Sequence, residues 1–271
     1  MMTDGKKEII TYWYKKLGFP EKYDKEFQEA LETYQIPDGL TVDTYDMEET
    51  DGKRNLLSYL YFCEALKDAY QKKGIPEEIL LDTLSDMVIW TNTWSDLKGE
   101  LHLSQLNWLK HHLSMKLFKI GRLQYYLAEA SHYRAVPEEN LQVGDPILDI
   151  HIPAVGPLTP EECARSIAMA KEFFAKYFPE HRYQGFVCHS WLLDESLKEI
   201  LPADSNILQF QKLFNLYGTE PSDAILRFVF CWNTTRENLR EFPAKSFLAE
   251  AVKRRLENGG SFYETTGVIK S

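Results

Sequence analysis

The sequence predicts an α/β (α+β) protein in two parts, a helical domain over residues 1–116 and a mixed-sheet domain over residues 117–271. Two observations lead to this prediction. In the first part, apolar residues recur every three or four positions, as on amphipathic helices. From about residue 118, short alternating segments typical of strands take over, with helical segments between them. Because strands and helices alternate there, we expect at least part of the sheet to be parallel.

The N-terminal part is predicted to be a series of helices. Glycine or proline marks most of their ends, because Gly18 and Gly74 follow two apolar-periodic segments and Pro20 and Pro76 precede two others. A loop is predicted at Trp94-Ser95-Asp96. The expected helices cover residues 6–17, 20–34, 55–73, a segment opening at 76, and a segment from about 104 to 117.

The segment from Asp145 to Phe214 organises the chain. It begins with a strand whose two faces differ, because Asp149 and His151 alternate with apolar residues. Thr159 then caps a helix that runs from Pro160 to Phe178, and Glu162 completes a capping box. A second strand follows at about residues 183–190. A strand–helix–strand unit of this length requires a right-handed crossover, so the two strands are predicted to be parallel neighbours.

The remaining strands and helices are predicted from shorter signals. One strand is expected at 117–130, with Gly121 as a bulge or bend, and a polar loop follows it from Ser131 to Gly144. A helix is expected to open at Ser205-Asn206, to carry Phe210 and Phe214 on one stripe and to end at Gly218. A strand at 225–232, a helix at 244–256 and a last strand at 262–269 follow. The sheet would then contain about five strands, with an antiparallel portion.

Composition limits the classes of function. The chain has 271 residues, a formal net charge of −10 and 44% hydrophobic residues, enough for a substantial core. An acidic chain of this kind is a poor non-specific nucleic-acid binder, which needs a basic surface. The N-terminus has no signal-peptide pattern and no apolar run reaches the length of a membrane span. We therefore expect a cytoplasmic protein with four reduced cysteines, no membrane contact and an undetermined oligomeric state.

Three strings in the C-terminal part carry a family resemblance. They are H-I-P-A-V-G-P-L-T-P-E-E-C from His151, C-H-S-W-L-L-D from Cys188 and D-S-N-I-L-Q-F from Asp204. They resemble bacterial acyltransferases that join an N-acyltransferase N-terminal domain to a GNAT-like C-terminal domain. The resemblance implies a GNAT fold and transfer of an acyl group from acetyl-CoA or another acyl-CoA to a small-molecule amine, with no metal.

The resemblance places the CoA pyrophosphate at the turn before the helix that opens at Pro160. Backbone N–H groups at a helix N-terminus bind phosphate. The predicted cofactor-binding residues are Ala154, Val155, Gly156, Leu158 and Thr159 in this turn, with Asn206 at the later helix. The alternative is a well-capped helix with no ligand, because Pro157 and Pro160 lack N–H groups and Glu161 and Glu162 add negative charge.

A second candidate is a general acid near Asn206. In the GNAT pattern, a helix that starts at an asparagine carries a tyrosine that protonates the departing CoA thiolate. Here the aromatic residue on that stripe is Phe214, which has no hydroxyl, so Tyr217 is predicted to replace it. The alternative is that Asp204 or Ser205 caps the helix and the aromatic residues belong to the core.

The third candidate is the pair His151 and His189, which the predicted strands bring to neighbouring positions. A neutral His151 can take the proton of an incoming amine. Cys188 is a second possible catalytic residue, acting as a nucleophile with a histidine base. Both residues have structural alternatives, since buried histidines and cysteines are common in cores. Two further functions stay open: a GNAT-shaped protein that binds a small molecule or partner without catalysis, and a cysteine-dependent hydrolase or acyltransferase.

Overall fold

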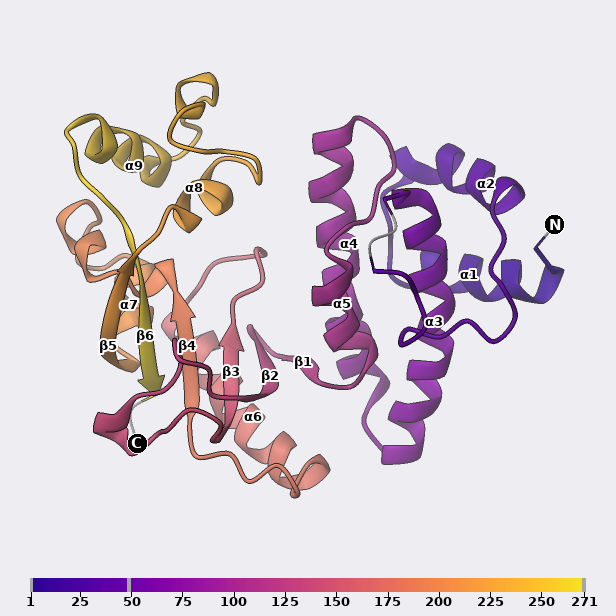
Figure 1. Ribbon diagram of the computed structural model, residues 1–271, viewed down its shortest axis with the longest axis horizontal. Coiled ribbons are helices and arrows are strands. Elements are labelled where there is room, and N and C mark those ends of the chain that lie inside the picture. The colour runs from indigo at the N-terminus through magenta and orange to yellow at the C-terminus, as the bar shows by residue number, and fades with distance from the viewer. Residues whose placement is uncertain (1, 48–49, 270–271) are drawn as a thin grey trace. The chain divides into compact units, whose positions relative to one another are not determined.

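The computed structural model describes residues 2–47 and 50–269, and the chain forms two compact units, Met1–Ile120 and Gly121–Ser271. The first unit is helical and the second is built on a mixed sheet, as Figure 1 shows. The predicted α/β class is therefore confirmed. Within the described ranges, no helix is both long and apolar enough to cross a membrane.

The first unit consists of helices followed by one short strand. Its elements are α1 (Asp4–Lys16), α2 (Asp24–Thr33), α3 (Gly52–Lys73), α4 (Glu77–Lys98), α5 (Leu106–Leu113) and β1 (Leu117–Ile120). Asp51 caps α3, because its carboxylate accepts hydrogen bonds from the backbone of Lys53 and Arg54. Gly74 and Gly99 end α3 and α4 in the left-handed conformation that favours glycine.

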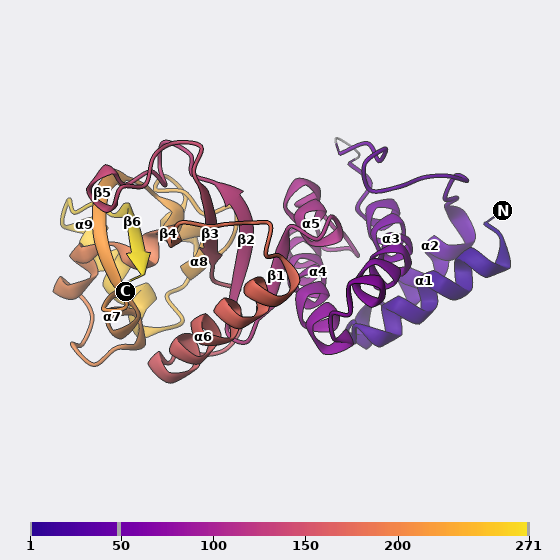
Figure 2. The same cartoon turned by 90° about the horizontal axis from the view of Figure 1, so that it is seen from below.

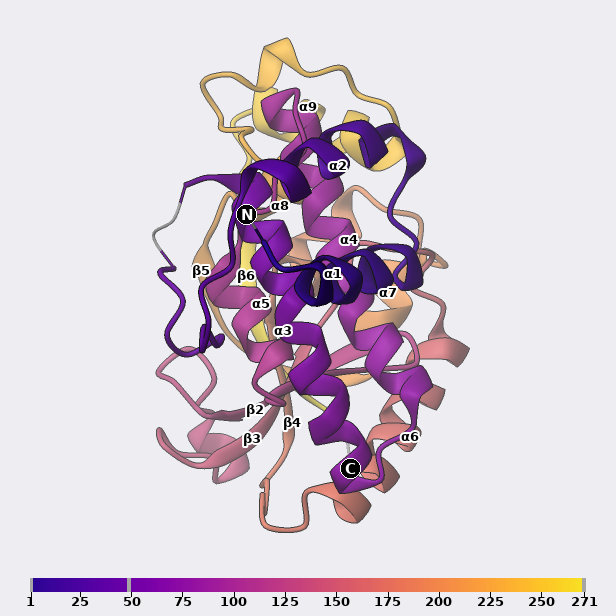
Figure 3. The same ribbon diagram turned by 90° about the vertical axis from the view of Figure 1, so that its right-hand side faces the viewer.

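Helix α3 is the centre of the first unit. It contacts α1, α2, α4 and α5, and Figures 1 and 3 show α1 crossing it at a steep angle. Trp13 of α1, Phe27 of α2 and Tyr59 of α3 are completely buried. The Trp13 indole donates to Glu64 and the Tyr59 hydroxyl to the backbone oxygen of Leu106, so these large rings are buried with their polar atoms satisfied.

The second unit alternates strands and helices. Its elements are β2 (Leu123–Glu129), β3 (Pro146–His151), α6 (Pro160–Tyr177), β4 (Phe186–Ser190), α7 (Asn206–Gln211), β5 (Phe214–Pro221), α8 (Ala224–Val229), α9 (Phe247–Glu257) and β6 (Tyr263–Ile269). The six-stranded sheet has the order β1-β2-β3-β4-β6-β5. Strands β3 and β4 are parallel neighbours joined through α6, as predicted, while β2–β3, β4–β6 and β5–β6 are antiparallel.

The two faces of this sheet differ in chemistry. One face packs on α6, where the Tyr125 hydroxyl lies 2.9 Å from the Ser166 hydroxyl and the Tyr125 ring meets Phe174 edge to face. Figure 2 shows α6 lying along this face. Residues directly opposite in the register share a face, which puts polar side chains on the other side. They are Gln124, Tyr126, Asp149, His151, His189, Tyr217, Glu220, Glu264 and Thr266.

Some predicted elements are wrong. Trp94–Asp96 is not a loop but part of α4, which ends at Lys98 with Gly99 as its C-cap. The Ser95 hydroxyl accepts a hydrogen bond from the backbone N–H of His102. The single strand predicted at 117–130 is two strands, β1 and β2, because Gly121 takes a φ of +65° and turns the chain.

Two further elements near the C-terminus differ from the prediction. The strand predicted at 225–232 is helix α8, since Ile225 and Leu226 bury against a cluster with Leu197 and Val252. A short apolar run does not separate strand from helix by its periodicity. The helix after Asn206 ends at Gln211, and Phe214 opens β5 instead of lying on that helix. The sheet therefore has one strand more than the predicted five.

Candidate functional site

The pairing between β3 and β4 stops before either strand ends. The parallel ladder joins Leu148 to Phe186 and Asp149 to Val187 and goes no further. Both strands nevertheless continue, because β3 stays paired with β2 as far as His151 and β4 stays paired with β6 as far as Ser190. The two central strands are therefore unpaired with each other at their carboxyl ends.

Backbone donors line this open end. In a continuing parallel ladder, the N–H of His189 would bond to the oxygen of Ile150, and the N–H of Ile152 would bond to the oxygen of His189. The part of the chain that the structure describes contains neither bond. These two N–H groups are thus available to a carbonyl oxygen placed between the strands.

The turn after β3 is held from one side by Arg122. Its guanidinium donates to the backbone oxygens of Pro153, Gly156 and Pro157, at 3.2, 3.2 and 2.8 Å. Burial lowers the pKa of Arg122. With these carbonyl groups bonded, the turn has a fixed conformation, in which Gly156 adopts a φ of +64°.

The turn also presents backbone donors at the start of α6. Among the described residues, the N–H groups of Gly156, Leu158, Thr159 and Glu161 have no hydrogen-bond acceptor, whereas the N–H of Val155 bonds to Pro153. Ala154, Val155 and Gly156 are exposed and Leu158 is buried. These donors lie at a helix N-terminus, where an anion is favoured.

The predicted cap of α6 is confirmed. The Thr159 hydroxyl accepts from the N–H of Glu162 at 3.4 Å and donates to its carboxylate at 2.8 Å. The Glu162 carboxylate therefore accepts from the Thr159 hydroxyl and not from the Thr159 N–H, so the second bond of the predicted capping box is missing among the described residues, and Glu161 is exposed in the first turn. The negative charge of Glu161 opposes phosphate binding at this end of the helix.

His151 ends β3 and pairs with a buried carboxylate. Its Nε2 lies 3.0 Å from Oδ2 of Asp149, and the Arg134 guanidinium donates to the same oxygen at 2.6 Å. Burial by itself would raise the pKa of Asp149, but His151 and Arg134 together lower it. An anionic Asp149 favours the proton on Nε2 of His151 and makes Nδ1 the acceptor nitrogen of the neutral ring.

Cys188 lies on the face of the sheet opposite to His151. Its side chain is completely buried, and burial raises the pKa of its thiol. A buried thiol that resists ionisation is a poor nucleophile. The structure therefore argues against the predicted nucleophilic role of Cys188, which packs as a small core residue.

The two other predicted residues, Tyr217 and Asn206, are on different elements. Tyr217 is on β5, not on the helix that Asn206 opens, and its hydroxyl donates to Glu139. This hydrogen bond raises the pKa of Tyr217. Ser205 caps α7 by accepting from the N–H of Leu208 at 3.4 Å, and Asn206 is exposed in the first turn.

Sequence reasoning missed Arg122 and Arg134. Arg122 is 31 to 35 residues from the carbonyl groups that it holds, and Arg134 is 15 residues from Asp149. Neither residue belongs to a recognisable string. A buried strand aspartate such as Asp149 does require a cationic partner, and this is the signal that points to an arginine nearby.

An open parallel pair that leads to a helix N-terminus is the arrangement expected of a GNAT fold, and comparisons with known proteins agree. Residues 117–269 match the family described as the GNAT-like C-terminal domain, and residues 2–115 match the N-acyltransferase N-terminal domain. The chain belongs to the family that joins these two domains.

Solved structures of acyltransferases are similar to this chain. One in complex with decanoyl-CoA has 33% identity, a TM-score of 0.69, and covers 79% of this chain and 64% of its own. A second, with decanoyl-CoA and teicoplanin, has 30% identity, a TM-score of 0.70, and covers 80% and 66%. A mutant in complex with octanoyl-CoA has 25% identity, a TM-score of 0.79, and covers 97% and 88%.

The present chain thus spans slightly less than two thirds of the length of the first two structures. The comparison with curated proteins found no match.

Proposed function

We propose that this protein transfers an acyl group from acyl-CoA to the amino group of a small molecule. The observation that carries the proposal is the open end of the β3–β4 pair, which leads into the turn at Gly156. The thioester would lie between the strands and the pyrophosphate against the N–H groups of the turn. The similarity to structures that contain decanoyl-CoA and octanoyl-CoA supports acyl-CoA as the donor and extends the expected donors beyond acetyl-CoA.

The chemistry follows from the groups at this end of the sheet. The nitrogen of the neutral amine attacks the thioester carbon, and the N–H groups of His189 and Ile152 stabilise the negative charge on the carbonyl oxygen. Nδ1 of His151 takes the proton that the amine loses. The carbon–sulfur bond then breaks, and the CoA thiolate takes the proton from the His151 imidazolium, so that the charge and the protons balance.

The acyl acceptor is a small molecule in this proposal. One similar structure contains teicoplanin together with decanoyl-CoA, which supports a small-molecule acceptor for the family. We propose a primary amine, because a neutral amine attacks a thioester through its own lone pair and then loses one proton, which His151 can take as a base.

A second candidate function is binding without catalysis. It is favoured by Pro157 and Pro160, which have no N–H to donate, and by Glu161, whose negative charge lies at the start of α6. This protein would keep the GNAT shape and bind a different ligand or a partner.

The test is amine-dependent release of CoA. The full chain is incubated with octanoyl-CoA and a panel of primary amines, and free CoA thiol is measured together with the mass of the acylated product. We expect thiol release that requires both an amine and the protein. If no amine in a broad panel causes release while octanoyl-CoA binds, the non-catalytic function is the better account.

A further inference from the structure

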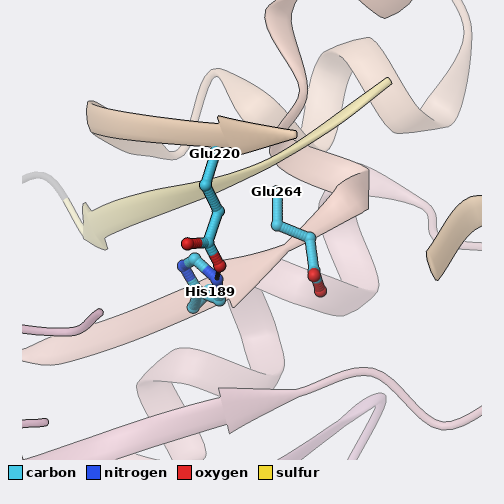
Figure 4. Close-up of side chains that lie close together, drawn as sticks. All are labelled: His189, Glu220 and Glu264. Atoms are coloured by element: carbon cyan, nitrogen blue, oxygen red, sulfur yellow. Dashed lines mark ion pairs between the residues drawn. The ribbon is translucent and has the colours of Figure 1, made fainter. Parts of the chain in front are cut away.

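The structure assigns a binding site for a divalent transition-metal cation to His189, Glu220 and Glu264. One side chain comes from each of β4, β5 and β6, and all three lie on the polar face of the sheet (Figure 4). One ligand atom from each residue lies within 4.8 Å of the other two. Among the described residues, this is the group of histidine, cysteine and carboxylate side chains that meets this condition.

The hydrogen bonds of His189 leave Nε2 as its ligand atom. The Thr266 hydroxyl donates its single proton to the backbone oxygen of Tyr133, so it can only accept from Nδ1 of His189, 2.9 Å away. In the neutral ring, Nδ1 then carries the proton and Nε2 carries the lone pair. Histidines that bind metals are oriented in the same way, through a donor bond from the other ring nitrogen.

The lone pair of Nε2 points toward carboxylates. Oε1 of Glu220 lies 3.4 Å from it, longer than a charge-assisted hydrogen bond of about 2.7–2.9 Å. With a neutral His189, both atoms are acceptors, and a cation between them would remove their repulsion. At tetrahedral angles, zinc bonds of about 2.0–2.2 Å place neighbouring N and O ligands about 3.4 Å apart, which agrees with the observed distance.

Glu264 supplies the third ligand and is also oriented. Its Oε2 accepts from the Ser222 hydroxyl at 2.7 Å, which leaves Oε1 for a cation. One imidazole and two carboxylates suit Zn²⁺ or Mn²⁺ better than a hard cation such as Mg²⁺, which prefers six oxygen ligands. The two negative charges also balance a divalent cation. This site departs from the expectation of a metal-free protein. It uses the side chain of His189, whereas the proposed acyl transfer uses only the backbone N–H of that residue.

The test is zinc binding by the full chain without a histidine tag. After treatment with a chelator and dialysis, the protein is titrated with Zn²⁺ by calorimetry, and the melting temperature is measured with Zn²⁺ and with Mg²⁺. We expect one Zn²⁺ per chain and a higher melting temperature with Zn²⁺ than with Mg²⁺. Glu264→Gln and Glu220→Gln should each lower the affinity at least tenfold.

The control is Glu172→Gln, which makes the same charge change at an exposed position on α6 and should bind Zn²⁺ like the native chain. Melting curves without zinc establish that each variant is folded. The assignment is overturned if the native chain binds no Zn²⁺, or if folded Glu264→Gln and Glu220→Gln bind it with unchanged affinity. Because no acyl-CoA is used, these outcomes are independent of the proposed transferase activity.

Discussion

At the scale of single residues, the pair of Asp149 and His151 decides whether the proposed site can take a proton from the acceptor amine. Asp149 is buried and is held by Arg134, so its charge fixes the ring of His151 at the end of β3. Sequence alternation placed these two side chains on one face. It could not show that Asp149 would be buried, because the loop that brings Arg134 over it comes from a different part of the chain.

His151→Ala should lower kcat by about two to four orders of magnitude, because the amine then loses its general base. The variant should stay folded with a lower melting temperature, since Asp149 loses His151 as a partner but keeps Arg134. Initial rates of CoA release give kcat, and His132→Ala, at an exposed histidine, serves as the control. Unchanged turnover in His151→Ala would remove this residue from the mechanism.

The difference in stability between the native chain and Asp149→Asn should depend on pH. The folded-state pKa of Asp149 is lowered, so its contribution is complete above the unfolded pKa of about 3.9 and is lost as the pH falls through the folded pKa. At pH 6 the variant should be less stable by about 1.5–3 kcal/mol, the value of a hydrogen bond to a charged group. Urea unfolding at pH 6 and at the lowest pH where both proteins fold measures the difference. A difference that does not shrink toward acid pH contradicts this account.

The cysteines give a simple test of burial. Cys63, Cys163 and Cys188 are buried, whereas Cys231 is partly exposed. A thiol reagent should therefore label one cysteine quickly in the native chain and four after unfolding. Cys231→Ser should lose the fast reaction. Fast native labelling of Cys188 would restore it as a candidate nucleophile.

At the scale of elements, the sequence predicted the unit β3–α6–β4 with its parallel pairing and its cap at Thr159, because an N-cap threonine, proline and glycine act locally. Elements whose form depends on distant contacts were not predictable. The sequence of helix α8 has the apolar run of a strand, and its burial against Leu197 and Val252 is a contact between distant parts of the chain. Strand β5 lies in a segment that was predicted to be the end of a helix. The open end of the β3–β4 pair is a property of two strands together, so no single string encodes it.

Gly156 tests the turn between β3 and α6. Gly156→Asp and Gly156→Asn have similar size, and both residues tolerate a positive φ better than other non-glycine residues. Only the aspartate adds a charge where the pyrophosphate is expected. Calorimetry with CoA should show at least tenfold weaker binding to Gly156→Asp than to Gly156→Asn. Equal affinity of the two variants would place the phosphates elsewhere.

At the scale of the whole molecule, the proposed acyl-CoA is an anionic ligand for a chain with a formal net charge of −10. Global electrostatics oppose this binding, so a local set of donors has to supply it. The unpaired N–H groups around Gly156 and between β3 and β4 are such a set. Family membership agrees with this assignment, although it identifies neither the acyl chain nor the acceptor for this chain.

The most direct test of the central claim is a thermal-shift titration of the full chain with CoA, acetyl-CoA and octanoyl-CoA up to millimolar concentration. A ligand that binds only the folded state stabilises it by about 2.7 kcal/mol at one hundred times its Kd. For domains of this size, that corresponds to a rise in melting temperature of roughly 5–10 °C. We predict such a rise with octanoyl-CoA and its reduction in Gly156→Asp but not in Gly156→Asn. No rise with any of the three ligands at millimolar concentration would contradict the proposal that this protein uses acyl-CoA.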